Sequence, residues 1–165
     1  MLSELFWIEG PWRGRLAISA RPRGGDWLED EVRSWRAAGV QAVLSLLTSE
    51  EVEELDLTRE SAVCEENEIR FHQLPIVDRC VPASDRDTEA VIRRIQDELE
   101  SGINVNVHCR QGIGRSAIIA AALLMEAGVP PERAIERVAK ARHVPVPETA
   151  GQRAWIDHFA ASLKR

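Results

Sequence analysis

The sequence has no apolar run of transmembrane length, and it holds only three cysteines among its 165 residues. A spanning helix needs about 20 consecutive apolar residues, so we expect no transmembrane segment. The first residues also lack the charged and apolar regions of a secretory signal peptide. Three cysteines are too few, and odd in number, for a disulfide framework. These absences favour a cytoplasmic protein whose thiols stay reduced.

Two further absences limit the kinds of partner that the chain is expected to have. Histidine and cysteine form no cluster with metal-ligand spacing, so we expect no metal and no other cofactor. Basic residues number 21 and acidic residues 27, which gives a net charge of −6. An acidic surface disfavours binding to nucleic acid or to an anionic membrane. No feature of the sequence indicates the oligomeric state.

The chain also shows no internal repeat, no low-complexity tract and no long linker. Its hydrophobic content of 44% and its charged content of 29% are typical of a globular protein. A length of 165 residues is sufficient for one hydrophobic core. We therefore expect a single domain over residues 1–165.

Short apolar segments and amphipathic segments alternate along the chain. The expected strands are 5–8, 15–19, 40–47, 69–75 and 103–108. The expected helices begin at Asp26, at Thr48 or Ser49, at Thr58, at Ser84 or Asp85, at Arg115, at Pro130 and at Thr149. This alternation predicts an α/β fold in which helices flank a central, largely parallel sheet. A solvated helix face is expected for the acidic residues Glu50, Glu51, Glu53 and Glu54.

The strongest functional signal lies in the stretch 104–125. A strand over 103–108 leads into a loop with two glycines, and a long apolar helix begins at Arg115. Backbone N–H groups of such a loop form an anion-binding site together with the positive end of the helix dipole. Ligands of parallel sheets bind at the carboxyl ends of the strands, where this loop is expected to lie.

Cys109 opens this loop and Arg115 closes it. A cysteine that faces a helix N-terminus and an arginine is stabilised as a thiolate, which is the nucleophilic form. A guanidinium presents a planar fork of donors that fits two oxygens of a phosphate. The hydroxyl group of Ser116 is expected to donate toward the sulfur as it leaves. Together these groups predict in-line attack of sulfur on a bound phosphate ester.

The spacing of cysteine and arginine alone is not specific, because all three cysteines have an arginine six positions later. The loop after Cys64 contains glutamates and no glycine, so it would repel an anion. The loop after Cys80 contains Pro82, which has no N–H group to donate, and an aspartate. Only the loop after Cys109 has glycines, no acid, a strand before it and a helix after it.

The nine residues 108–116, with the sequence HCRQGIGRS, resemble the signature loop of the cysteine-dependent protein tyrosine phosphatases. The short chain resembles the dual-specificity-like branch of that superfamily. The resemblance implies a phosphatase-like fold with a strand–P-loop–helix active site. It also implies hydrolysis of phosphomonoesters through a phosphocysteine intermediate on Cys109, with Arg115 and Ser116 as further catalytic residues. The residues expected to bind the substrate are Arg110, Gln111, Gly112, Ile113 and Gly114.

The leaving oxygen of a phosphate ester needs a proton, which a carboxylic acid on a nearby loop can supply. Asp78, Asp85 and Asp87 are the candidates. Asp85 and Asp87 suit the capped first turn of a helix. Asp78 directly follows a predicted strand. In similar short phosphatases the general acid occupies such a loop at a similar separation from the cysteine. The resemblance therefore selects Asp78, which would act as the base in the second step.

Three other residues are supporting candidates. In similar enzymes the histidine at the position of His108 orders the loop and helps to keep the thiolate ionised. The segment around Gln152 resembles one that brings a glutamine to the hydrolytic water, although a glutamine on the surface at a helix start is the alternative. Cys80 lies close to Asp78 in the chain, and a disulfide with Cys109 under oxidation is weighed against an ordinary loop cysteine.

The substrate is expected to be a phosphorylated protein or a small phosphate ester. The chain lacks the length for a deep phosphotyrosine cleft, so a shallow site for phosphotyrosine and phosphoserine or phosphothreonine is plausible. Phosphoinositide phosphatases of this superfamily usually carry lysines in the loop, which this chain does not have. RNA 5′-phosphates fit poorly with the acidic charge. A phosphate-binding pseudophosphatase, and a sulfur-transfer or arsenate-reducing domain, are the alternatives of other classes.

Overall fold

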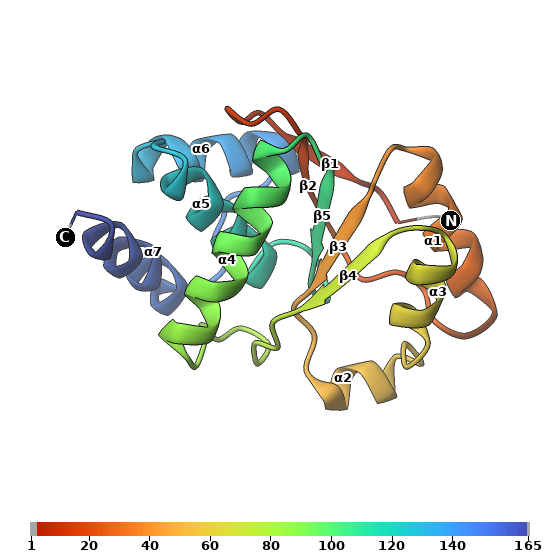
Figure 1. Cartoon of the computed structure of the whole chain (residues 1–165). Coiled ribbons are helices and arrows are strands. Elements are labelled where there is room, and N and C mark those ends of the chain that lie inside the picture. The colour runs from red at the N-terminus through yellow and green to blue at the C-terminus, as the bar shows by residue number, and fades with distance from the viewer. Residues whose placement is uncertain (1–2, 165) are drawn as a thin grey trace.

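A computed structural model describes residues 3–164 of the chain, and its helices and strands alternate (Figure 1). The strands are β1 (Phe6–Ile8), β2 (Leu16–Ser19), β3 (Ala42–Ser45), β4 (Arg70–Gln73) and β5 (Val105–His108). The helices are α1 (Leu28–Ala37), α2 (Ser49–Glu54), α3 (Glu60–Glu66), α4 (Asp85–Glu100), α5 (Arg115–Glu126), α6 (Pro131–Arg142) and α7 (Ala150–Ser162). A short 3₁₀ helix, Gly25–Trp27, precedes α1. Residues 1–2 and 165 lie outside this description.

The five strands form one sheet in the order β1-β2-β5-β3-β4. Strand β1 pairs antiparallel with β2, and the other three pairings are parallel. Strand β5 lies at the centre, where Val105 is level with Leu16 of β2 and with Ala42 of β3. The predicted α/β fold with a largely parallel sheet is therefore confirmed.

Helices cover both faces of the sheet, as Figure 1 shows, with α4 to α7 on one side and α1 and α3 on the other. Each side has its own apolar cluster. The first includes Leu44, Ile95 and most of α5, and the second includes Val32, Trp35 and Val43. Leu44 and Val43 are neighbours on β3 and enter different clusters, because successive strand side chains point to opposite faces.

Helix α5 is the best covered helix of the fold, because every side chain from Arg115 to Met125 is buried. Alanines at positions 120–122 let the helix lie close to its neighbours, and it contacts α4, α6 and α7 as well as two strands. The buried strand β5 in front of it carries Asn106, whose side-chain amide donates to Ser19 Oγ at 3.0 Å. Because α5 follows the central strand β5 and contacts both β2 and β5, its N-terminal end is held against the centre of the sheet.

Some local expectations need correction. Asp26 does not cap α1, because the 3₁₀ turn comes first and Trp27, without a capping side chain, occupies the cap position. Thr48 does cap α2, in a reciprocal capping box with Glu51. Glu51 is only 7% exposed, so it does not belong to a solvated face as expected. In the described part of the chain, no helix is long and apolar enough to cross a membrane.

Candidate active site

The loop between β5 and α5 surrounds the side chain of Cys109. Its sulfur is buried, with 3% of the residue exposed, and accepts a hydrogen bond from the N–H group of Gly112 at 3.2 Å. Gly114 is the residue before the helix, and Arg115 begins α5. The sequence-predicted strand, loop and helix N-terminus therefore come together around the thiol.

The loop carbonyl groups are held away from the sulfur. The oxygens of Gln111 and Gly112 accept hydrogen bonds from the guanidinium of Arg142, each at 3.2 Å. The oxygen of Arg110 accepts from the N–H group of Arg21 at 3.3 Å. In a planar trans peptide the carbonyl and the next N–H point in opposite directions. The N–H groups of residues 111–113 therefore point away from these two arginines, and the N–H group of Gly112 donates to the sulfur, as expected for an anion cradle.

Gly112 is a position in this loop at which neighbouring backbone excludes a side chain. Its φ of +77° lies in the left-handed region, which favours glycine. A Cβ atom there would also lie 2.6 Å from the carbonyl carbon and oxygen of Ser19. The close approach to the end of β2 fixes the loop over the sheet.

Arg115 is enclosed by acceptors although it begins a helix. Its Nη1 donates to Glu51 Oε1 at 2.6 Å and to the carbonyl oxygen of Ile76 at 2.7 Å. Its Nη2 donates to Glu51 Oε2 at 2.9 Å and lies 3.2 Å from Asp78 Oδ1. The residue is 1% exposed. A two-pronged ion pair of this kind fixes the plane of the guanidinium as well as its position.

The surroundings of Arg115 and Glu51 favour the charged form of both side chains. Burial alone would lower the pKa of Arg115, but the hydrogen bond that it donates to Glu51 and the charges of Cys109, Glu51 and Asp78 raise it above its ordinary value. Burial alone would raise the pKa of Glu51, but the bonds from Arg115 and Thr48 bring it below its ordinary value. Glu51 is thus ionised at neutral pH and holds a permanent cation beside the loop.

Asp78 is the candidate acid whose carboxylate contacts Arg115 in the described chain. It lies between β4 and α4, and its side chain is 51% exposed. Asp85 and Asp87 occupy the first turn of α4, where Ser84 caps the helix by accepting from the N–H group of Asp87. Their expected place at a helix start agrees with the structure.

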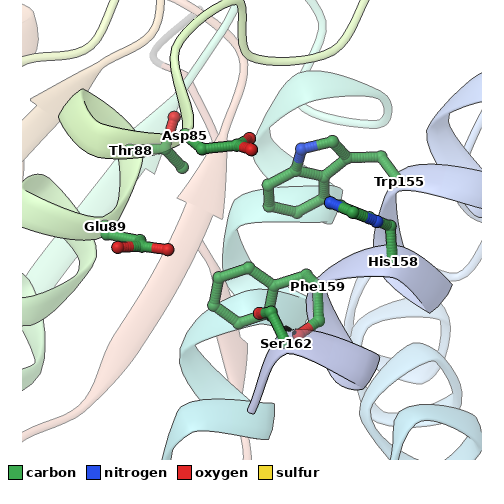
Figure 2. Close-up of a pocket in the computed structure, with 7 residues that line it drawn as sticks. All are labelled: Asp85, Thr88, Glu89, Trp155, His158, Phe159 and Ser162. Atoms are coloured by element: carbon green, nitrogen blue, oxygen red, sulfur yellow. Dashed lines mark hydrogen bonds between the residues drawn. The ribbon is translucent and has the colours of Figure 1, made fainter. Parts of the chain in front are cut away.

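The side chain of Asp85 lines a separate pocket between α4 and α7. Figure 2 shows this pocket, in which the Asp85 carboxylate extends toward the indole ring of Trp155. The lining of the pocket includes the stacked rings of Trp155 and Phe159, whose centroids are 5.3 Å apart. The residues that line it include no member of the loop 108–116. Asp85 therefore faces a pocket that the loop 108–116 does not line.

His108 lies at the other end of the loop in a closed environment. Its Nε2 is 2.6 Å from Glu60 Oε2, and both side chains are almost fully buried. The ring of Trp35 lies against the imidazole, with centroids 5.9 Å apart. Glu60 belongs to α3 on the far side of the sheet from α5, so the histidine is anchored from that side.

The remaining candidates have mixed outcomes. Gln152 is not on the surface, because it is fully buried and its amide donates to the carbonyl oxygen of Cys80 at 3.2 Å. The Oγ atom of Ser116 is buried and has no hydrogen-bond partner within the described residues, and its expected bond to the departing sulfur stays a prediction. Arg110 is paired with Glu54 at 3.2 Å, and its expected contact with a substrate stays a prediction. Within residues 3–164, no three potential ligands gather as a metal site would require.

The comparison with family models decides the relationship. The model described as PTP-SAK, "Swiss Army Knife protein, DSP-PTPase phosphatase domain", matches residues 6–157. The chain belongs to this family. The PTP-SAK domain is thus a cysteine-dependent phosphatase domain of the dual-specificity type, as the loop sequence predicted. No curated protein matches the sequence.

Solved structures share the fold of this PTP-SAK domain over nearly its whole length. Kinase-associated phosphatase, with its catalytic-site cysteine replaced by serine, is 18% identical over 99% of this chain and 97% of its own, with a TM-score of 0.87. Tk-PTP in its active form is 25% identical over 95% and 96%, with a TM-score of 0.77. PTPMT1 in complex with PI(5)P is 23% identical over 96% and 97%, with a TM-score of 0.78.

Several residues of this PTP-SAK site were missed by the sequence reasoning. Glu51, Glu60 and Arg142 contact the loop or its ends. The capping-box pattern Thr48-x-x-Glu51 was a signal for the local position of Glu51 at the start of a helix. Neither Glu60 nor Arg142 stands in a local pattern that indicates its partner.

Proposed function

We propose that the protein is a phosphomonoester hydrolase that works through a phosphocysteine intermediate on Cys109, within one phosphatase domain over the chain. The observation that carries this proposal is the inward-facing loop. At the centre of the loop, the thiol accepts a hydrogen bond from an N–H group. At the edge of the loop, a buried arginine is fixed by its ion pair. Donors preorganised in this way stabilise the negative charge that develops on a transferring phosphoryl group.

The first chemical step forms a sulfur–phosphorus bond and breaks the phosphorus–oxygen ester bond. The thiolate of Cys109 attacks in line, while Arg115 and the loop N–H groups bind the other phosphoryl oxygens. Asp78 gives its proton to the leaving oxygen, which departs as an alcohol or phenol. Its position beside Arg115, at 3.2 Å, supports this role because it places the carboxyl group at the rim of the phosphate site.

The second step returns the enzyme to its starting state. Asp78, now a carboxylate, takes a proton from water, and the water oxygen attacks phosphorus. The sulfur–phosphorus bond breaks and inorganic phosphate leaves. Ser116 eases departure of the thiolate, and its buried, unpaired hydroxyl group has a bond to offer. Gln152 is the candidate for orienting the water, since its amide lies close to Gly114.

The charges at the rim favour a singly phosphorylated protein residue as the substrate. Glu54, Asp78 and Glu148 stand around the loop, and Arg110 is neutralised by Glu54. A headgroup with several phosphates would be repelled by these carboxylates. A phosphoinositide remains the alternative substrate, and PTPMT1 in complex with PI(5)P gives the reason to test it.

The test is hydrolysis of nitrophenyl phosphate and of a panel of phosphopeptides and phosphoinositides. Cys109→Ser is expected to abolish turnover and to keep affinity for vanadate or phosphate. Asp78→Ala should lower turnover by about 10²–10⁴. Retained turnover in Cys109→Ser would overturn the nucleophile. A comparable loss in Asp85→Ala, with Asp78→Ala active, would reassign the acid.

A further inference from the structure

Two contacts join the acid loop, residues 74–84 between β4 and α4, to the start of α7. Arg79 Nη1 donates to Glu148 Oε2 at 2.9 Å. The buried amide of Gln152 donates to the carbonyl oxygen of Cys80 at 3.2 Å. Both contacts lie within two residues of Asp78 in the chain. The segment 148–152 therefore holds the acid loop directly beside the candidate acid.

The acid loop has a strained backbone at the same place. Val77 O accepts a hydrogen bond from the N–H group of Cys80 at 2.9 Å, which closes a four-residue turn with Asp78 at its second position. Arg79 has a φ of +63°, in the left-handed region. That conformation costs a non-glycine residue about 1–2 kcal/mol and persists where the surroundings hold it. The ion pair to Glu148 is such a restraint.

The other end of this restraint rests on the cysteine loop. A Cβ atom on Gly114 would lie 2.5 Å from Glu148 Oε1 and 3.2 Å from Gln152 Nε2. The backbone N–H group of Glu148 also donates to Gln152 Oε1 at 3.2 Å, which fixes the Gln152 side chain relative to the backbone at Glu148. Glu148 thus touches the cysteine loop with one oxygen and the acid loop with the other.

We propose that Arg79 and Glu148 are positioning residues that register the turn carrying Asp78 against the cysteine loop. This inference rests on the proposed function, because it assigns a role in delivering the proton to the leaving oxygen. Arg79 acts through Asp78 and touches no reacting atom. Without the ion pair, the turn samples other orientations, and the fraction of molecules with Asp78 at the phosphate site falls.

The test compares a poor leaving group with a good one. Phenyl phosphate needs a proton on its leaving oxygen more than nitrophenyl phosphate does, and kcat/KM for both reports the first step. Arg79→Met is expected to lower kcat/KM for phenyl phosphate about two- to fivefold, the range that a largely exposed ion pair can supply. The value for nitrophenyl phosphate should change by less than that. Arg79→Lys, which keeps the charge, should restore most of the loss.

A double-mutant cycle identifies the partner. The pair Arg79→Met and Glu148→Gln should lose no more on phenyl phosphate than Arg79→Met alone, because both remove the same contact. Arg36→Met is the matched control. It removes an exposed arginine that is paired at 3.2 Å with Glu68. Glu68 has a positive φ, as Arg79 does, so this ion pair too lies beside a left-handed residue. Arg36→Met should leave both activities unchanged.

The outcomes separate this proposal from the proposed function. Turnover of nitrophenyl phosphate by the unaltered protein, and its loss in Cys109→Ser, test the function alone. An equal loss on both esters, no loss at all, or additive losses in the double variant would overturn the positioning role. Thermal unfolding of each variant, expected within a few degrees of the unaltered protein, shows that the fold is kept.

Discussion

The two ends of the cysteine loop are each held by a buried glutamate, yet they lie in different surroundings. At Arg115, Glu51 shares the guanidinium with the carbonyl oxygens of Leu46 and Ile76 and with Asp78, whose side chain is half exposed. At His108, Glu60 is closed in by the core around Trp35. At the Arg115 end, solvent or a substrate can displace the half-exposed carboxylate of Asp78. At the His108 end, the described residues offer no exposed acceptor of this kind. We propose that the Arg115 end keeps a charge ready for a ligand and that the His108 end supports the fold.

The largest effect is expected at the Arg115 end. Glu51→Gln replaces one charge-assisted bond to Arg115, worth about 1.5–3 kcal/mol. If that energy holds the guanidinium in place, kcat/KM for nitrophenyl phosphate should fall about 10- to 100-fold. Steady-state kinetics measure this. Unchanged kinetics would mean that the carbonyl oxygens of Leu46 and Ile76 suffice to orient Arg115.

The ion pair of Glu51 also predicts that the stability of the fold depends on pH. The folded-state pKa of Glu51 lies below its ordinary value of 4.5. Its carboxylate therefore stabilises the fold above pH 4.5, and this contribution is lost as the pH falls through the lower folded-state pKa. Urea unfolding of the unaltered protein should weaken over that window more than unfolding of Glu51→Gln. Parallel curves would contradict the assignment.

A smaller effect on activity is expected at the His108 end. Glu60→Gln keeps a hydrogen-bond acceptor for the imidazole and should cost about 1–3 kcal/mol of stability. With the fold intact, kcat/KM should stay within about threefold, on the order of 0.6 kcal/mol. Glu31→Gln is the control, because Glu31 is buried and paired with Arg23 away from the loop. A loss of activity as large as that of Glu51→Gln would remove the distinction between the two ends.

A final comparison concerns two buried thiols. Burial raises the pKa of the Cys64 thiol, and the charges of Glu60 and Glu65 raise it further. Cys109 instead faces N–H groups and a cation. Iodoacetamide at neutral pH should modify Cys109 at least about tenfold faster than Cys64, as peptide mass spectrometry can measure. Equal rates would show that the charges around the two sulfurs do not differ as proposed.

The strand, the loop and α5 could be predicted from the sequence because their signals are local. Glycines, a thiol and an apolar run stand within about twenty adjacent residues. Glu51 and Arg115 are 64 positions apart, and His108 and Glu60 are 48 apart, so no local pattern joins them. The acidic run around Glu51 looked solvated because a charge-rich helix usually faces water. Its capping box turns this one glutamate inward.

The same limit applies to Gln152 and Arg79. Gln152 was weighed as a surface residue because a polar residue in the first turn of a helix is normally exposed. It is buried because the acid loop covers it and offers the carbonyl oxygen of Cys80. Nothing next to Arg79 in the chain indicates its pairing with Glu148, 69 positions away. The roles of the site residues, the cytoplasmic location and the substrate stay predictions.

The enclosure of α5 on all sides has a consequence for how the protein loses its shape. A helix without a solvent-facing side cannot tilt or slide unless its neighbours separate. The loop that leads into its first turn should therefore keep its structure until the whole protein unfolds. On heating, the capacity to hold an oxyanion should vanish together with the tertiary structure, with no earlier softening of the loop.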